Sequence, residues 1–191
     1  AIDCYMLHWP EAWAYQGPLK DLASMSPAEQ ESLVFPTDGD GERATVDVPL
    51  IETWGRLERL VDDGLARTIG VCNVSLDQLE RIVETARILP AVVQVESHPY
   101  LPRTDLVGAC HERGIRVIAH SPLSAPGLLE DPVLLDVADA HGVAPASVAL
   151  AWQVGRGVVP IPSSTDTEHV VSNLAAARLR LTPAERERIA T

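Results

Sequence analysis

Positive charge is scarce in this sequence, and so are long apolar runs. The chain has 191 residues and a formal charge of −12, from 15 lysine and arginine residues against 27 aspartate and glutamate residues. Because proteins that bind nucleic acid carry basic patches, this balance argues against a nucleic-acid partner. Apolar stretches such as Ile88–Val93 are far too short to cross a bilayer, so we expect no membrane association. The first residues include no basic segment, and we expect no signal peptide.

Cysteine is also rare. Cys4, Cys72 and Cys110 form an odd set without the spacing of metal ligands. Such residues are typical of small buried side chains in a reducing compartment. We therefore predict a cytoplasmic protein with no metal site.

Short apolar segments of strand type recur along the chain, and each is followed by a helical pattern. They are Asp3–His8, Thr68–Cys72, Val92–Glu96, Arg116–His120 and Val158–Ile161. Regular alternation of strand and helix predicts a parallel α/β sheet, and the length suits one domain over residues 1–191. The strands are nearly continuous apolar runs, so we expect them to be buried on both faces.

Helix signals lie between these strands. Ser75 and Gln78 form a capping box, Asp131 with Pro132 begins a later helix, and an additional helix is expected over Pro145–Gln153. Apolar spacing assigns these side chains to buried helix faces: Leu50, Ile51, Trp54, Leu57, Val61, Leu79, Ile82, Val83, Ala86, Leu106, Val107, Cys110, Leu134, Leu135 and Ala138.

One connection is unusually long. Residues 10–47 contain a short helical signal at Ser26, Pro27 and Glu29 but no strand pattern. Connections of this length inside a compact domain are usually functional lids or disordered segments. Because this one follows the carboxyl end of a strand, we interpret it as a loop on the substrate side, with a tolerated surface insertion as the alternative.

Polar residues end nearly every predicted strand. They are His8, Cys72–Asn73, Gln94, Glu96, His120–Ser121 and Ser163–Ser164. Taken singly, Asn73 and Gln94 also fit structural roles, as a helix cap and as the partner of a neighbouring loop. Buried polar groups cost free energy unless they are bonded, and barrel enzymes gather their sites at the carboxyl ends of parallel strands. Together these residues favour a functional site.

Several segments resemble the aldo-keto reductase family in the order in which they occur. They read "DCYMLHWP", "GLARTIGVCNVSLDQLERI", "AVVQVESHPYL", "GIRVIAHSPLS", "DPVLLDVADAHGVAPASVALAW" and "RGVVPIPSSTDTEHVVSNL". The resemblance runs from the fourth to the eighth strand of that family. It implies a (β/α)8 barrel that transfers a hydride between NADPH and a carbonyl or alcohol, acting on a small molecule.

The resemblance also implies roles for individual residues. His8 is the catalytic histidine that orients the substrate carbonyl, with Trp9 and Trp13 on the substrate side. The residues implied in binding NADP(H) are Cys72, Asn73, Gln94, His120, Ser121, Leu123, Ser163, Ser164, Thr165, His169 and Asn173. Cys72, Asn73 and Gln94 correspond to the nicotinamide-amide ligands, and Ser163, Ser164 and His169 to the ligands of the adenosine 2′-phosphate.

Some of these positions depart from the family pattern. His120 stands where a tyrosine usually stacks on the nicotinamide, and Ser163 and His169 stand for a lysine and an arginine. Charge-assisted bonds to phosphate are thereby lost. Ser164 and the N–H groups near Asp166 remain as phosphate ligands, although the carboxylate of Asp166 opposes them. We expect altered NADP(H) specificity.

The family's other catalytic residues, an aspartate, a tyrosine and a lysine, precede the fourth strand and have no counterparts here; Tyr5, Tyr15 and Lys20 are poor substitutes. Five strands cannot close an eight-stranded barrel. Three interpretations are open: the chain is a piece of a reductase, a natural short form with a non-redox role, or one half of a complex. In the last case a second copy or a complementing chain would cover its edge strands. The first reading predicts a reductase portion inactive alone. The second predicts acid–base chemistry by His8 and His120, or an interaction module. The substrate, the choice between NADP and NAD, and the oligomeric state stay open.

Overall fold

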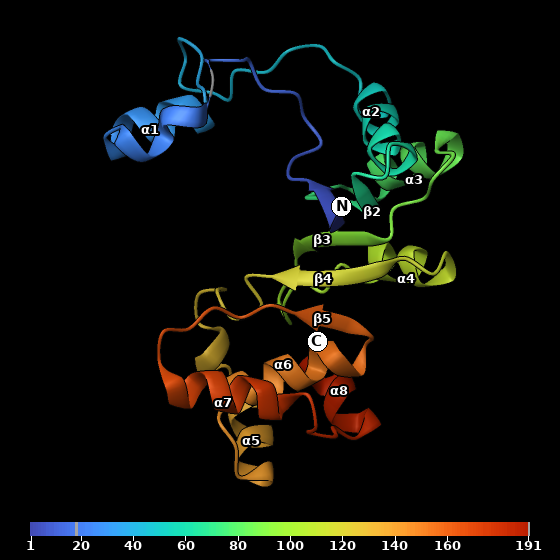
Figure 1. Ribbon diagram of the computed structural model, residues 1–191. Helices are drawn as coiled ribbons and strands as arrows, with labels where there is room; N and C mark the ends of the chain where they lie inside the picture. Colours follow the sequence, from blue (N-terminus) through green and yellow to red (C-terminus); the bar gives the residue numbers. More distant parts are fainter. Residues whose placement is uncertain (18, 191) are drawn as a thin grey trace.

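The computed structural model describes residues 1–17 and 19–190. Its sheet is parallel, with spatial order equal to chain order (Figure 1): β1 (Ile2–Leu7), β2 (Ala66–Cys72), β3 (Val92–Glu96), β4 (Arg116–His120) and β5 (Val158–Pro160). The predicted strands are confirmed, with bounds that differ by at most two residues. The fold is an incomplete barrel of five parallel strands with helices between them.

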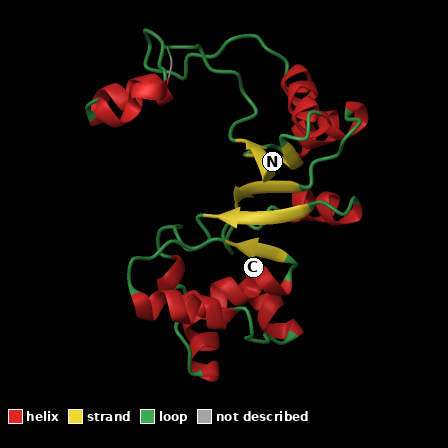
Figure 2. Ribbon diagram, in the orientation of Figure 1, coloured by secondary structure: helices red, strands yellow, loops and turns green. Residues whose placement is uncertain are grey.

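The helices follow the strands as the sequence predicts (Figure 2). Their bounds are α1 (Pro27–Val34), α2 (Leu50–Asp62), α3 (Leu76–Thr85), α4 (Thr104–Glu112), α5 (Pro132–His141), α6 (Pro145–Gly155), α7 (Thr167–Ala176) and α8 (Pro183–Ile189). Short 3-10 turns are η1 (Leu19–Ser24) and η2 (Leu128–Glu130). The capping box of Ser75 and Gln78 is present, and the Asp131 side chain caps α5. Helix α2 packs on β2, α4 on β4 and α6 on β5.

Burial of the strands corrects one prediction. Val93 and Val95 of β3 are buried in the core shared with the helices, whereas Gln94 between them and Glu96 after them are only half-buried. The same alternation occurs in β4. The prediction of burial on both faces holds for the end of β2, where Ile69, Gly70, Val71 and Cys72 are all buried. It was wrong for β3 and β4, where, in the described part of the chain, the residues that point away from the helices are only partly buried or exposed.

Two assignments of helix faces were also wrong. Ile51 is 38% exposed and Leu135 is 43% exposed, whereas Val137 is buried beside Leu134. Each misassigned residue directly neighbours a buried or partly buried one along its helix. Consecutive residues of a helix are about 100° apart around its axis, so at the border of a buried face the next residue turns toward solvent, as Ile51 and Leu135 do.

The connection from residue 10 to residue 47 projects away from the sheet beyond β1, with α1 at its far end (Figure 1). An antiparallel bridge between Trp13 and Thr45 joins its two arms, and a second bridge, between Thr37 and Arg43, closes a local turn in the returning arm.

Within residues 1–17 and 19–190, no single helix has the length and apolar composition of a membrane span. Among these residues, one pair of consecutive helices, α5 and α6, has that length and composition when the two are combined, but they meet at a bend of 93°.

Candidate functional site

A chain of hydrogen bonds links the carboxyl ends of β1, β2 and β4. The side-chain Nδ2 of Asn73 donates to the backbone oxygen of His8 at 2.9 Å. The Oδ1 of Asn73 lies 3.0 Å from Nε2 of His120, and the Nδ1 of His120 lies 3.1 Å from Oγ of Ser121. With the amide in this orientation, Nε2–H of His120 donates to Asn73, and Nδ1 accepts from the Ser121 hydroxyl. These contacts fit a neutral imidazole with its proton on Nε2.

Left-handed backbone geometry places two of these residues. Asn73 has φ 58° and Ser121 has φ 50°, and each directly follows its strand. Asparagine tolerates this conformation better than most residues, because its short polar side chain bonds locally. The turn takes Asn73 out of the ladder, while its N–H still donates to the carbonyl of Gln94 at 2.8 Å. Its carboxamide is thus directed across the strand ends.

Electrostatics favour a neutral His120. Partial burial lowers the pKa of His120 below its ordinary value, and the charges of His8 and Arg103 lower it further, while Glu96 acts in the opposite direction. The net direction is downward, in agreement with the hydrogen bonds. Asn73 bridges the two histidines, since it bonds to the backbone oxygen of His8 and to the ring of His120.

Gln94 and Cys72 occupy neighbouring register positions on β3 and β2. Gln94 is half-buried, and its carboxamide makes no hydrogen bond to another described residue. Cys72 is 5% exposed, and burial raises the pKa of its thiol to about 11. The thiol is therefore un-ionised at neutral pH, and Gln94 is the amide that remains available to a ligand.

A row of aromatic rings leads from His8 into the long connection. The ring of His8 lies 5.8 Å from that of Trp9, which lies 5.9 Å from Trp13. Trp13 in turn contacts Phe35, and the Arg43 guanidinium lies 4.6 Å from the Trp13 ring centre. The two predicted substrate-side tryptophans are therefore connected to His8 through ring contacts.

No described tyrosine takes the place of a second proton donor beside His8. Tyr5 pairs with Ile69, a core residue, and so points to the helix-covered face, as strand alternation predicts. Tyr15 is 80% exposed on the long connection. The side chain of Lys20, the third candidate, lies outside the described residues.

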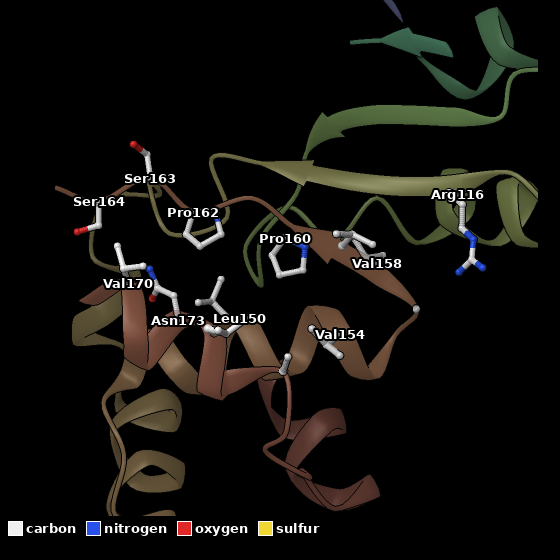
Figure 3. A pocket seen from close by; sticks show the side chains of 14 residues that line it. Arg116, Leu150, Val154, Val158, Pro160, Pro162, Ser163, Ser164, Val170 and Asn173 are labelled. Carbon is white, nitrogen blue, oxygen red and sulfur yellow. The ribbon is translucent and has the colours of Figure 1, made fainter. Parts of the chain in front are cut away.

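A groove runs along β5 between α6 and α7, with a volume of about 760 Å³ (Figure 3). Ser163, Ser164 and Asn173 lie at one end of it, and Arg116 lies at the other. Apolar side chains form most of its wall, with Val158, Val170 and Leu174 among them. Three of the residues predicted for the adenosine end are thus brought together.

Helix α7 begins at the rim of this groove, and Asp166 caps it. The Oδ1 of Asp166 accepts hydrogen bonds from the backbone N–H groups of Glu168, at 2.7 Å, and of His169, at 3.3 Å. These bonds lower the pKa of Asp166, which is therefore ionised at neutral pH. The N–H groups expected to hold a phosphate are engaged by this carboxylate instead.

Other predicted ligands lie outside the two clusters. Leu123 packs against the core formed by α5, α6 and α8, and Thr165 and His169 are exposed near the start of α7.

The residues therefore fit the nicotinamide end of a dinucleotide, whereas the adenosine end lacks the cationic groups that a 2′-phosphate needs. Gln94 offers a free carboxamide, and His120 a fixed neutral ring, for an aromatic carboxamide. The adenosine end offers hydroxyls and an apolar wall, and among the described residues that line it the only lysine or arginine is Arg116, at the end opposite Ser164.

Two features of the candidate site were not predicted from the sequence. Arg103, in a left-handed conformation with φ 51°, bonds to the Glu96 carbonyl and acts on His120. The apolar wall from α7 was also missed. Its signal was the spacing of Val170 and Leu174, which are 51% and 76% exposed and lie one helical turn apart.

Comparisons with known proteins agree with this geometry. The model of the aldo/keto reductase family matches residues 1–191. Aldo-keto reductase family 1 member A1 of Mus musculus is 34% identical over 198 residues, which cover 98% of this chain and 56% of that protein. An aldo/keto reductase of Synechocystis sp. is 38% identical, with 99% of this chain and 57% of that protein covered.

Solved structures give the same result. The aldose reductase from Schistosoma japonicum superposes with a TM-score of 0.84 at 31% identity, covering 98% of this chain and 57% of that one. The aldose reductase from Giardia lamblia gives 0.83 at 31% identity, covering 98% and 60%. The chain thus spans a little over half the length of the relatives that it matches.

Proposed function

The chain belongs to the aldo/keto reductase family, and we propose that it supplies the dinucleotide-binding strand ends of an oxidoreductase that interconverts a small carbonyl compound and its alcohol. The observation that carries the proposal is the convergence of His8, Asn73, Gln94 and His120 at the carboxyl ends of adjacent strands.

The proposed binding of the nicotinamide follows from the groups left free. The carboxamide of Gln94 is complementary to the nicotinamide carboxamide, since both carry one acceptor and two donor hydrogens. Asn73 holds the imidazole of His120, whose flat face then supports the ring. Cys72 lies beside Gln94 at the base of the proposed nicotinamide site, and its thiol is un-ionised.

His8 is proposed to donate a hydrogen bond to the substrate carbonyl oxygen. When bound, the reduced nicotinamide would supply a hydride to the carbonyl carbon, and the oxygen would take the balancing proton from solvent. A donor fixed at a strand end stabilises the negative charge that develops on this oxygen. Trp9 and Trp13 would flank the apolar part of the substrate.

Members of this family generally use NADP(H), which makes it the first cofactor to test. We propose a cytoplasmic protein without a nucleic-acid partner, in keeping with its charge of −12. Contacts at the edges of the sheet, with a second copy or with a complementing chain, belong to the same proposal.

The test is to measure, by calorimetry, the binding of the dinucleotide to the 191-residue chain. Gln94→Leu should weaken binding of the reduced dinucleotide by about tenfold, because the hydrogen bonds of the half-buried carboxamide are lost. Gln16→Leu, which changes an exposed residue of the long connection, is the matched control and should leave binding unchanged. Equal affinity for the unchanged chain and Gln94→Leu would argue against the proposal.

A second candidate is non-redox acid–base chemistry by His8 and His120, favoured by their proximity and their link through Asn73. A neutral histidine can accept a proton from a carbon next to a carbonyl. NMR would then show deuterium exchange into small ketones in D2O. His8→Gln should lower that exchange about 100-fold with folding intact, and the absence of exchange excludes this candidate.

A further inference from the structure

The groove between β5 and α7 is the site that the proposed function assigns to the adenosine half of the dinucleotide. In the proposed function, this half lies beside Ser163, Ser164 and Asn173 (Figure 3). The groove adjoins the strand whose end holds His120, because β4 and β5 are neighbours. An apolar wall suits an adenine ring, and the polar rim suits a ribose.

The charged side chains near Ser163 and Ser164 are acidic, with His169 as the one imidazole of residues 158–177. Residues 158–177 contain Asp166 and Glu168 but no lysine or arginine. Arg116 lines the opposite end of the groove from Ser163 and Ser164 (Figure 3). The next cation along the chain, Arg178, follows the other end of α7, about 15 Å from its start at 1.5 Å per residue.

Asp166 adds negative charge at the place where a phosphate would be expected. The start of a helix attracts an anion through its unpaired N–H groups. Here the carboxylate of Asp166 is the resident anion, because it binds the N–H groups of Glu168 and His169. A second anion would meet two engaged donors and a like charge. A ribose hydroxyl would instead meet an acceptor, because the other carboxylate oxygen makes no side-chain or backbone bond within the described residues.

We propose that this groove selects a dinucleotide whose adenosine ribose carries a free 2′-hydroxyl, so that the chain binds NAD(H) in preference to NADP(H). The choice of a carboxylate for the ribose hydroxyl and a cation for the 2′-phosphate is the general solution to this discrimination. The inference rests on the proposed function, because it assumes that the dinucleotide lies across these strand ends.

The test compares NADH and NADPH on the 191-residue chain by calorimetry at low ionic strength. NADH should bind at least about tenfold more tightly, because like charges within a few ångströms repel strongly where solvent screening is incomplete. The difference should narrow in high salt, which screens the exposed Asp166 carboxylate.

Asp166→Asn is the decisive variant. Asparagine caps a helix about as well as aspartate, so α7 should remain folded while the charge is lost. The preference for NADH should then fall several-fold, mainly through tighter binding of NADPH. Asp77→Asn removes one acidic charge from the first turn of α3, outside the groove, and should leave the preference unchanged.

The outcomes separate the two proposals. If NADPH binds as tightly as NADH or more tightly, or if Asp166→Asn leaves the preference unchanged, the specificity inference falls while the dinucleotide-binding function stands. If neither dinucleotide binds, the proposed function falls and the inference falls with it.

Discussion

At the end of β4, the imidazole of His120 is held between Asn73 and Ser121. Burial lowers the pKa of His120 below its ordinary value of 6.5. The unfolded chain therefore binds a proton at this position before the folded chain does, so stability falls as the pH drops from about 6.5 through the folded-state pKa. We predict that His120→Phe makes the free energy of unfolding less dependent on pH between pH 7 and 5, as measured by urea titration. An NMR titration of His120 with a midpoint at or above 6.5 would contradict this.

The convergence of these polar side chains could be predicted because each is tied to a strand end. His8, Asn73, Gln94 and His120 all lie where the pattern of apolar runs stops. The bond between Asn73 and His120 could not be predicted, because it spans two strands and depends on register and on the left-handed turn at Asn73. The helix cap at Asp166 was likewise visible only as an acidic residue near a helix start.

In the middle of β2, Gly70 permits close packing with β3. A Cβ at this position would lie 2.8 Å from the backbone oxygen of Val92 and 3.2 Å from Cγ of Met6. Backbone cannot move away without breaking the ladder, so we predict that Gly70→Ala lowers the free energy of unfolding by about 2 kcal/mol or more. Gly108→Ala is the control, since nothing lies within 4 Å of its added Cβ in α4, and it should be neutral or stabilising by up to about 1 kcal/mol. Equal effects of the two substitutions in urea unfolding would refute this account.

Elements were predicted more accurately than their faces. Caps fix where a helix begins, and the Ser75 box and the Asp131–Pro132 start are local signals that the structure confirms. Which side of α5 is buried depends on the partner helix, and Leu135 was assigned inward although Val137 lies there. The same limit applies to the strands, since an apolar run does not reveal whether a second layer covers its other face.

For the whole chain, the described residues provide one acid–base group at the proposed substrate position. His8 has no tyrosine beside it, because Tyr5 points to the helices and the hydroxyl of Tyr100 bonds to Asp131 at 2.8 Å. General acid catalysis is worth about 10²–10⁴-fold. We predict that the 191-residue chain alone does not reduce simple aldehydes with NADH or NADPH. Turnover comparable to that of a full-length relative, measured by dinucleotide absorbance, would contradict this prediction.

The sheet has two edges in the described part of the chain, because β1 pairs only with β2 and β5 only with β4. Unpaired strand edges bind other strands, and apolar side chains lie beside them: Ile2 is 50% exposed and Val159 is 49% exposed. We therefore predict that the 191-residue chain self-associates at micromolar concentration in sedimentation velocity experiments.

Charge placed on one edge tests this prediction. Val159→Lys should shift the chain toward the monomer, because a lysine at an edge strand opposes pairing with another strand. Leu135→Lys is the matched control: Leu135 has a comparable exposed fraction of 43% but lies on α5, away from both edges, so association should persist. A monodisperse monomer that melts cooperatively without any substitution would show that this chain protects its edges by itself. The arm formed by residues 10–47 would then be the first segment to examine, since it leaves the sheet directly from the β1 edge.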